Sequence, residues 1–379
     1  MTLPIHDGLK ELALSGIRQY TVLANQTEGC IKMAMGEPEF DTPMPIREAA
    51  IQSIQNGETH YPPGNGIPEL LDALSQFAKK QGMDYAPDEI VVTAGATGAL
   101  FSALFGLLNP GDEVLVPTPA FGLYDAIIHL AQAVCCEVDV SQHGFQLTRE
   151  LLEQHCTGRT KAIVVTSPGN PTGCIYNRES LQAVAELARE KGLYVICDDV
   201  YNQLIYTSDY TRFAVEYPDL RKQIVVVDSF SKPYAMTGWR AGWLMADKSL
   251  KEQLQKVHQF SVVSITSFIQ KACITALGLD VSDMRESYRQ RRDFVCARLE
   301  QMGLSFPRPE GAFYIFVSIK EFGLSDEEFC VRLIKEGGLG VIPGSCFGTP
   351  GYVRLSYCQQ QEQLEEGMNR LEAFVQKLR

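Results

Sequence analysis

The chain has 379 residues, of which 45% are hydrophobic and 21% are charged, and these values are ordinary for a globular protein. Its net charge of −12 argues against nucleic acid or an anionic membrane as a partner. There is no apolar run long enough to span a bilayer, and the length favours two domains.

The cysteines and histidines show no pattern typical of a disulfide framework or a metal site. The eleven cysteines are irregularly spaced, with no Cys-x-x-Cys pair, and the six histidines are not clustered. A reduced, cytoplasmic location is the simplest interpretation. Residues 1–7 lack a basic stretch followed by an apolar one, so no signal peptide is predicted.

From about residue 44 to 270, the hydrophobic pattern alternates between helix and strand. Short runs rich in β-branched residues predict strands at 90–93, 113–116, 161–165, 194–197 and 224–227. Helical spacing of apolar residues predicts helices at 46–51 and just beyond, 97–108, 121–131 and 179–191. This alternation is typical of βαβ units, so we expect an α/β fold with a mostly parallel sheet.

Beyond about residue 280 the pattern changes to a smaller α+β arrangement. The expected elements are helices at 284–302, 326–336 and 363–378 and strands at 312–317 and 352–357. The sequence therefore predicts a large domain at 44–280 and a small domain formed by 1–43 together with 281–379.

The segment from Ser229 to Arg240 places a lysine just after the apolar run at 224–227. Partial burial beside a strand end lowers the basicity of an amine, so Lys232 could act as a nucleophile toward a carbonyl. The hydroxyl of Ser229 and the guanidinium of Arg240 would suit a phosphate. Together these groups indicate pyridoxal 5′-phosphate (PLP) chemistry. The alternative for Lys232 is an ordinary exposed lysine in a loop.

Two further segments follow predicted strands. Asn170, in an Asn-Pro-Thr-Gly turn, follows the strand at 161–165, where ligands bind in open α/β sheets. Asp198 ends the strand at 194–197 and could keep a pyridine nitrogen protonated, while Tyr201 could hydrogen-bond a phenolic oxygen. The alternatives are a plain turn for Asn170 and a helix N-cap for Asp198 or its neighbour Asp199.

Two more segments could bind anions. The small residues around Ala96 and Thr97 link a strand to a helix, whose free N–H groups attract a phosphate. Arg354 lies in a largely apolar strand, and a buried arginine needs an anionic partner. That partner is either a substrate carboxylate or an internal salt bridge.

These segments, in this order, resemble the fold-type I, class I aminotransferases across nearly the whole chain. The resemblance implies the fold-type I PLP-transferase fold, with Lys232 as the Schiff-base lysine and Arg240 as a phosphate ligand. It also implies that Ser229 and the backbone at Ala96 and Thr97 complete the phosphate cradle. Phe121 looks like the aromatic residue that stacks on the ring, although plain core packing is the alternative.

The same resemblance extends to three other residues and to the assembly. Tyr61 is similar to the family's tyrosine that reaches the phosphate across a dimer interface, which implies a homodimer. Gly36 resembles the backbone position beside the substrate carboxylate, near Asn170 and Arg354. Two positions depart from the commonest pattern: Asp199 stands where many relatives have Glu, and Gly98 where Glu or Gln is frequent. Glycine at 98 would weaken the first turn of its helix.

The segments at 15–18, 236–240, 256–259 and 311–316 carry a closer resemblance, to bacterial aminotransferases of the aromatic and N-acetyl-diaminopimelate type. It implies a small-molecule amino donor with an acidic, aromatic or diaminopimelate-like side chain, and a 2-oxo acid such as 2-oxoglutarate as acceptor. Ile17 and Arg18 could line the mouth of the site. The rival interpretations are a PLP-dependent C–S β-lyase on the same fold and a non-catalytic PLP-binding regulator.

Overall fold

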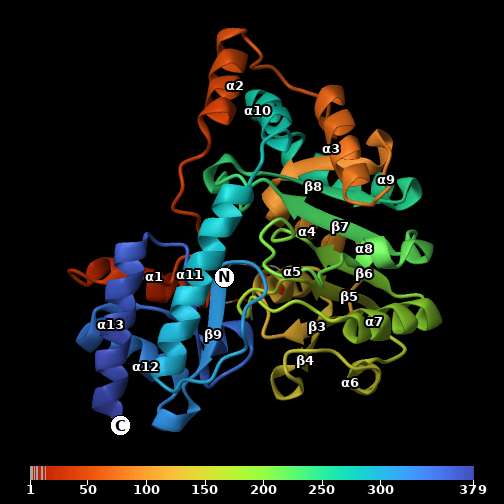
Figure 1. The fold of residues 1–379 in the computed structure, drawn as a ribbon. Coiled ribbons are helices and arrows are strands. Elements are labelled where there is room, and N and C mark those ends of the chain that lie inside the picture. The colour runs from red at the N-terminus through yellow and green to blue at the C-terminus, as the bar shows by residue number, and fades with distance from the viewer. Residues whose placement is uncertain (1–2, 4, 6, 10–11, 13) are drawn as a thin grey trace.

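A seven-stranded sheet forms the centre of the computed structural model, which describes residues 3, 5, 7–9, 12 and 14–379 (Figure 1). Its strands, in spatial order, are β2 (Ile90–Ala94), β8 (Ala241–Ala246), β7 (Ile224–Ser229), β6 (Tyr194–Asp198), β5 (Thr160–Thr166), β3 (Glu113–Thr118) and β4 (Val134–Asp139). All neighbours are parallel except β8, which is antiparallel to both β2 and β7. The predicted mostly parallel α/β sheet is confirmed.

Helices cover both faces of this sheet, which explains why its inner strands carry continuous apolar runs before their polar ends. One face packs on α4 (Gly95–Leu107), α5 (Leu123–Leu130) and α9 (Lys248–Val262). The other packs on α3 (Pro68–Lys80), α6 (Arg149–His155), α7 (Arg178–Lys191) and α10 (Ser267–Leu277). Successive strand residues point to opposite faces, so Val225 and Val226 join different core clusters.

A smaller α+β layer lies beside the large sheet (Figure 1). Its three-stranded antiparallel sheet has the order β11 (Ile342–Pro343), β12 (Tyr352–Ser356) and β9 (Tyr314–Ser318). A two-residue strand, β1 (Ile31–Lys32), pairs in parallel with β10 (Leu339–Gly340). The surrounding helices are α1 (Gly16–Gln26), α11 (Ser282–Gln301), α12 (Asp326–Arg332) and α13 (Gln361–Leu378).

Two remaining helices complete the large-sheet region: α2 (Met44–Gln55), which packs on α10 at the top of Figure 1, and the short α8 (Phe213–Glu216). Among the described residues, none of the helices combines the length and apolar character needed to cross a bilayer. The predicted absence of a signal peptide concerns residues 1–7, most of which lie outside the described residues.

Several predicted boundaries differ from the observed ones for local reasons. The strand predicted from Ala312 begins at Tyr314, because Ala312 has a φ of 57° and is not extended. The helix predicted at 326–336 remains α-helical only to Arg332 and then continues as a π-helical turn. The division into domains at residues 44 and 280 remains a prediction.

Candidate active site

A cavity of about 270 Å³ lies at the carboxyl ends of β5, β6 and β7, where parallel sheets place their ligands. It contains all the residues that the sequence singled out for the site except Tyr61 and Arg18. Those lining it are Gly36, Ala96, Thr97, Phe121, Asn170, Asp198, Tyr201, Ser229, Lys232, Arg240 and Arg354. Segments up to about 320 residues apart in the chain therefore meet in one place, as Arg354 and Ala34 do.

Lys232 stands half-buried in the cavity wall, just after β7. Its Nζ donates a hydrogen bond to the Gly36 carbonyl at 2.7 Å. Burial lowers the pKa of Lys232 to about 8, and the positive charges of Arg354 and Arg240 add to that effect. An amine with this pKa is partly uncharged near neutral pH, so the exposed-lysine alternative is wrong and Lys232 can act as a nucleophile or base.

Asp198 is buried at the end of β6, and its two carboxylate oxygens have different surroundings. Oδ2 accepts a 2.5 Å hydrogen bond from the Tyr124 hydroxyl, whereas Oδ1 is buried without a partner. Burial raises the pKa of Asp198 to about 6, although the Tyr124 hydrogen bond opposes this. No helix follows β6 until α8, so the N-cap alternative is wrong.

The unpaired Oδ1 of Asp198 indicates which group would fit this end of the cavity. A buried acceptor without a donor costs free energy, and a ring N–H would remove that cost. Phe121 lies on the adjacent wall, edge-to-face against Tyr124 at 6.4 Å between ring centroids. The buried acceptor and the aromatic surface present therefore fit a protonated pyridine ring.

The opposite end of the cavity is suited to a phosphate. The 13-residue helix α4 begins at Gly95, so the N–H groups of its first turn are free to bind an anion. The hydroxyls of Ser229 and Ser231 lie 2.8 Å apart there. The Arg240 guanidinium lies so close to Gly95 that a Cβ at residue 95 would be 2.7 Å from Nη2. Glycine is required at 95 for this reason and for its φ of 69°.

Arg354 is buried on β12 and uses its guanidinium to join the two layers. Nη1 donates to Asn170 Oδ1 at 2.8 Å and Nη2 donates to the Ala34 carbonyl at 2.7 Å, while Nε has no partner. The described residues provide no carboxylate within ion-pair distance of it, so the internal salt-bridge alternative is not supported. A buried, uncompensated guanidinium is suited to an incoming carboxylate.

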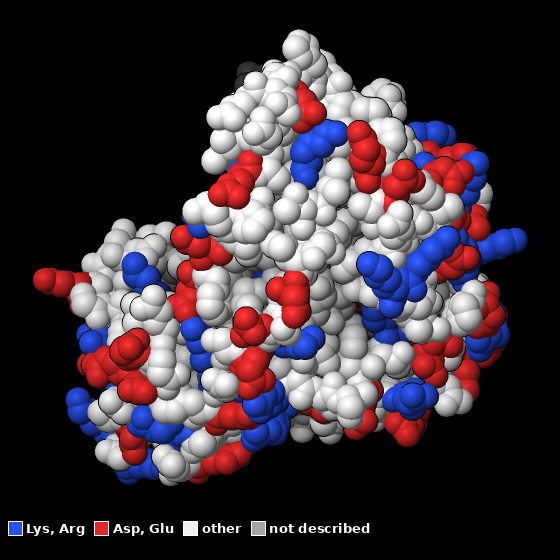
Figure 2. All heavy atoms as spheres, turned by 45° about the horizontal axis from the view of Figure 1, so that its top comes forward, with Lys and Arg blue, Asp and Glu red and all other residues white. Residues whose placement is uncertain are grey.

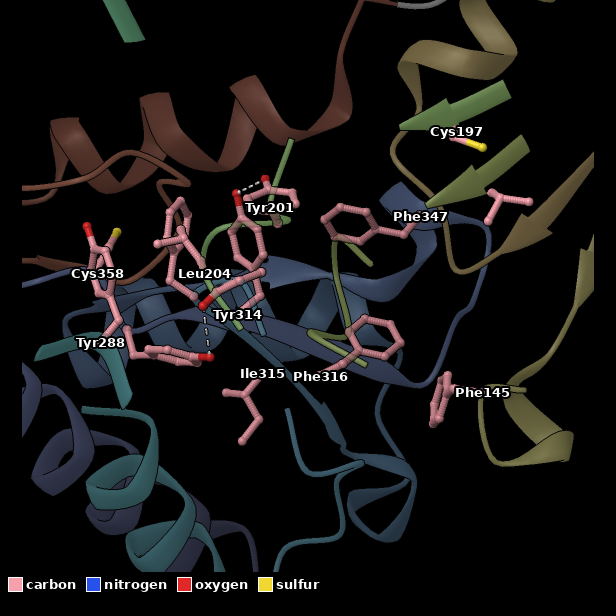
Figure 3. Close-up of a cluster of buried hydrophobic side chains, with 14 of the residues drawn as sticks. Phe145, Cys197, Tyr201, Leu204, Tyr288, Tyr314, Ile315, Phe316, Phe347 and Cys358 are labelled. Atoms are coloured by element: carbon pink, nitrogen blue, oxygen red, sulfur yellow. Dashed lines mark hydrogen bonds between the residues drawn. The ribbon is translucent and has the colours of Figure 1, made fainter. Parts of the chain in front are cut away.

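Two tyrosines of a buried aromatic cluster, Tyr201 and Tyr314, line the cavity and lie close together in Figure 3. The hydroxyls of Tyr201 and Tyr314 are 3.0 Å apart, and the Arg354 guanidinium lies over the Tyr314 ring at 4.5 Å. A Cβ at residue 36 would be 2.0 Å from the Tyr314 hydroxyl oxygen, so only glycine fits at Gly36. This explains the backbone role expected there.

Tyr61 is a predicted cofactor-binding residue that the chain does not bring to the cavity. Its side chain is 90% exposed, and it borders a separate surface hollow formed with residues 264–268. Ile17 lines the main cavity, but Arg18 is exposed outside it.

Sequence reasoning did not single out Tyr124 and Tyr314, which line the cavity and contact predicted residues. A signal for Tyr124 was present, because it comes three residues after Phe121 and such residues share one side of a helical segment. Tyr314 offered no such signal, because the three residues that follow it in its strand, at 315–317, are equally apolar.

Gly98 lies in the first turn of α4, where many members of the resembled family have Glu or Gln. Glycine at this position should lower the stability of the protein. A Cβ there would be 3.4 Å from Ala94 Cβ, an ordinary contact. Gly98→Ala should therefore raise the free energy of unfolding by about 1 kcal/mol, the difference in helix propensity.

Gly106, in the same helix, provides a matched control for Gly98. A Cβ there would be 2.9 Å from the buried Leu254 side chain. Gly106→Ala should gain less stability than Gly98→Ala, or lose stability, because the crowding opposes the propensity gain. Urea unfolding of both variants measures the difference, and equal gains would contradict this account.

Comparison with known proteins identifies the class to which this fold and site belong. The family model described as aminotransferase class I and II matches residues 28–371, and the chain belongs to this family. A probable N-acetyl-LL-diaminopimelate aminotransferase from Bacillus subtilis is 40% identical, with 98% of this chain and 95% of that protein covered.

Two solved structures are similar over nearly the whole chain. An aspartate aminotransferase from Thermotoga maritima has a TM-score of 0.92 and 36% identity, covering 98% of this chain and 100% of that one. An aromatic aminotransferase from Pyrococcus horikoshii has a TM-score of 0.90 and 36% identity, covering 95% and 100%. The protein is accordingly an amino-acid aminotransferase with the type I fold, and these matches support neither the lyase nor the regulator interpretation.

Proposed function

We propose that this aminotransferase binds PLP in the cavity through Lys232 and exchanges an amino group between an L-amino acid and a 2-oxo acid. The observation that carries the proposal is the combination of three groups in one cavity. They are an amine with a lowered pKa, a buried acid with an unpaired oxygen, and a buried guanidinium without a carboxylate partner.

Each group has a separate task. Bound PLP supplies an electron-poor ring that accepts the electron pair of the substrate Cα–H bond. Asp198 would hold a proton at the ring nitrogen, and Tyr201 would hydrogen-bond the phenolic oxygen. Phe121 would stack on the ring face, which excludes water from that side.

The phosphate and the substrate would be bound at opposite ends. Ser229, Arg240 and the backbone N–H groups of Ala96 and Thr97 would hold the phosphate. Arg354, Asn170 and the backbone at Gly36 would orient the substrate carboxylate, leaving its Cα–H bond near Lys232 Nζ. Lys232 would then take the proton from Cα as a general base.

The donor is expected to be an acidic, aromatic or diaminopimelate-like amino acid, with 2-oxoglutarate as a suitable acceptor. Support comes from the relatives, which are described as aspartate, aromatic-amino-acid and N-acetyl-LL-diaminopimelate aminotransferases. A panel of such donors with 2-oxoglutarate, assayed for glutamate, should show turnover with at least one donor and none with Lys232→Ala. A protein that released pyruvate from cystathionine but exchanged no amino group would overturn the proposal.

The working unit would be a homodimer in the cytoplasm. Tyr61 and Phe260 are 90% and 87% exposed, and Figure 2 shows few charged side chains on the projecting upper part of the molecule. A second copy of the chain packed against Tyr61 would let this tyrosine reach the phosphate site of that second copy. All eleven cysteines are unpaired, which suits a reducing compartment.

Light scattering tests the dimer and should give twice the chain mass of 42.1 kDa. Tyr61→Phe should keep that mass and weaken PLP binding, since it removes only the hydroxyl. A monomeric protein with full activity would contradict this assembly.

A further inference from the structure

A buried group of charges lies behind the cavity and takes no part in the chemistry described above. We call it the Arg212 cluster, which consists of Arg212, Asp199, Asp228 and Asn202. The Arg212 Nε donates to Asp199 Oδ2 at 2.8 Å, and its Nη2 lies 2.7 Å from the same oxygen and 3.6 Å from Asp228 Oδ2. Its Nη1 donates to Gln81 Oε1. None of the three charged side chains is more than 7% exposed.

The cluster connects the ends of two neighbouring strands. Asp199 directly follows β6, and Asp228 is the penultimate residue of β7, which pairs with β6 in parallel. Asn202 Nδ2 donates both to Asp228 Oδ2 and to the Asp199 carbonyl, each at 2.6 Å. Asp228 Oδ1 also accepts from the Ser229 backbone N–H at 2.7 Å. Arg212 therefore contacts the carboxylates at both strand ends, Asp199 by a hydrogen bond and Asp228 by a longer ion pair.

The residues adjacent to these two carboxylates face the other way. Successive residues of an extended chain point to opposite sides. Asp198 and Ser229 line the cavity, whereas Asp199 and Asp228 do not. The distance between Asp198 and Ser229 therefore depends on the ends of β6 and β7, which the Arg212 cluster connects on the side away from the cavity.

We propose that Arg212 is a positioning residue for the cofactor: by joining the carboxylates of Asp199 and Asp228, it holds Asp198 and Ser229 at the spacing that the ring nitrogen and the phosphate require. The proposal rests on the proposed function, because it concerns binding of PLP in this cavity. It also explains why a second acid next to Asp198 is retained in a dry interior, where unpaired charges are costly.

The charge of Arg212 adds an effect on pH dependence. Arg212 is faced by Asp199, Asp228 and the neutral Tyr210, Tyr85 and Cys197. Asp198 is faced by Asp199, Lys232, Tyr124, Tyr201 and Cys197. Burial raises the pKa of Asp228 to about 7, and the Arg212 charge opposes this. Without that charge beside it, the negative Asp199 would act more strongly on Asp198 and raise the pKa of Asp198 further.

Two variants separate geometry from charge. Arg212→Lys keeps the charge but loses the planar fork, so apoprotein should bind PLP about tenfold more weakly, an effect typical of supporting residues. Arg212→Met should bind PLP at least as weakly. It should also move the acid midpoint of the bound-cofactor absorption up by about one pH unit, because a nearby positive charge is lost.

Arg292→Lys is the matched control, because Arg292 is also 7% exposed and hydrogen-bonds the Pro309 carbonyl away from the cavity. It should lower the unfolding temperature without changing PLP affinity or the pH midpoint. The proposal is overturned if Arg212→Lys binds PLP as tightly as the wild type, and this variant decides the matter even if Arg212→Met does not fold. A wild-type protein that binds no PLP would instead overturn the proposed function.

Discussion

Lys232→Ala is expected to lower turnover by at least about 10⁴-fold, the upper range for loss of a general base, and to remove the visible absorption of the bound cofactor. The reason is that Lys232 is the one lysine among the described residues that line the cavity, half-buried and hydrogen-bonded to the Gly36 carbonyl at 2.7 Å. Lys232→Arg should be equally inactive. It keeps a positive charge, but a guanidinium does not give up its proton near neutral pH.

The lowered pKa of Lys232 predicts the pH dependence of cofactor capture. The uncharged amine is the reactive form, so the rate at which apoprotein takes up PLP should rise with pH and level off above about 8. With an ordinary lysine, the rate would continue to rise until about pH 10.4. Stopped-flow absorption measures this rate, and a rise that continued past pH 10 would contradict the assignment of a desolvated amine.

Lys251 provides the matched control for Lys232→Ala. It is only 6% exposed, and its Nζ donates to Gln255 within α9 at 3.0 Å, outside the cavity. Burial also lowers the pKa of Lys251. Both lysines are therefore desolvated amines, but only Lys232 lines the cavity. Lys251→Ala should keep both cofactor and turnover. Equal losses in the two variants would show that Lys232 acts only through stability.

The inner strands were predictable because burial on both faces leaves a simple signal. The runs at 163–165 and 224–227 are continuously apolar, and both became central strands of the large sheet. The strand β8 was missed because Gly242 interrupts it and Arg240 directly precedes it. The edge strand β4 was missed because its residues, Val-Cys-Cys-Glu-Val-Asp, are mostly only half-buried or exposed.

The site was predictable where one segment carries its own chemistry, and not where two segments must meet. Lys232 and Asp198 each follow an apolar strand, so their place at the sheet edge could be inferred. The bond from Tyr124 to Asp198 joins residues 74 positions apart. The contact of Arg212 with Asp228 likewise depends on a loop whose path the sequence pattern does not specify. Such pairings require the fold.

Asp198→Asn is expected to lower kcat/KM by about 10³-fold, the upper range for losing one preorganised electrostatic group. A neutral amide lacks the negative charge that keeps the proton on the ring nitrogen, so the ring would be a weaker electron sink. The change is nearly isosteric, and the Asn oxygen can still accept the Tyr124 hydrogen bond. PLP should still bind through Lys232 and the phosphate cradle, so the loss should fall mainly on kcat.

The same substitution should stabilise the apoprotein at pH 7. Burial raises the folded-state pKa of Asp198 to about 6, above the unfolded value of about 3.9, so the folded state binds the extra proton between these values. Ionisation of Asp198 therefore costs folding free energy that is absent below pH 4 and fully present above pH 6. The shift corresponds to about 2–3 kcal/mol, which the neutral amide avoids.

Urea unfolding of the wild-type and Asp198→Asn apoproteins at several pH values measures this difference in the free energy of unfolding. Asp198→Asn should be the more stable protein at pH 7, and the two should converge as the pH falls toward 4, where the aspartic acid is itself neutral. A variant that lost activity and was also less stable at pH 7 would mean that Asp198 has a structural role. The stability gain, together with the lost turnover, would instead identify a buried charge that is kept for the chemistry at the ring nitrogen.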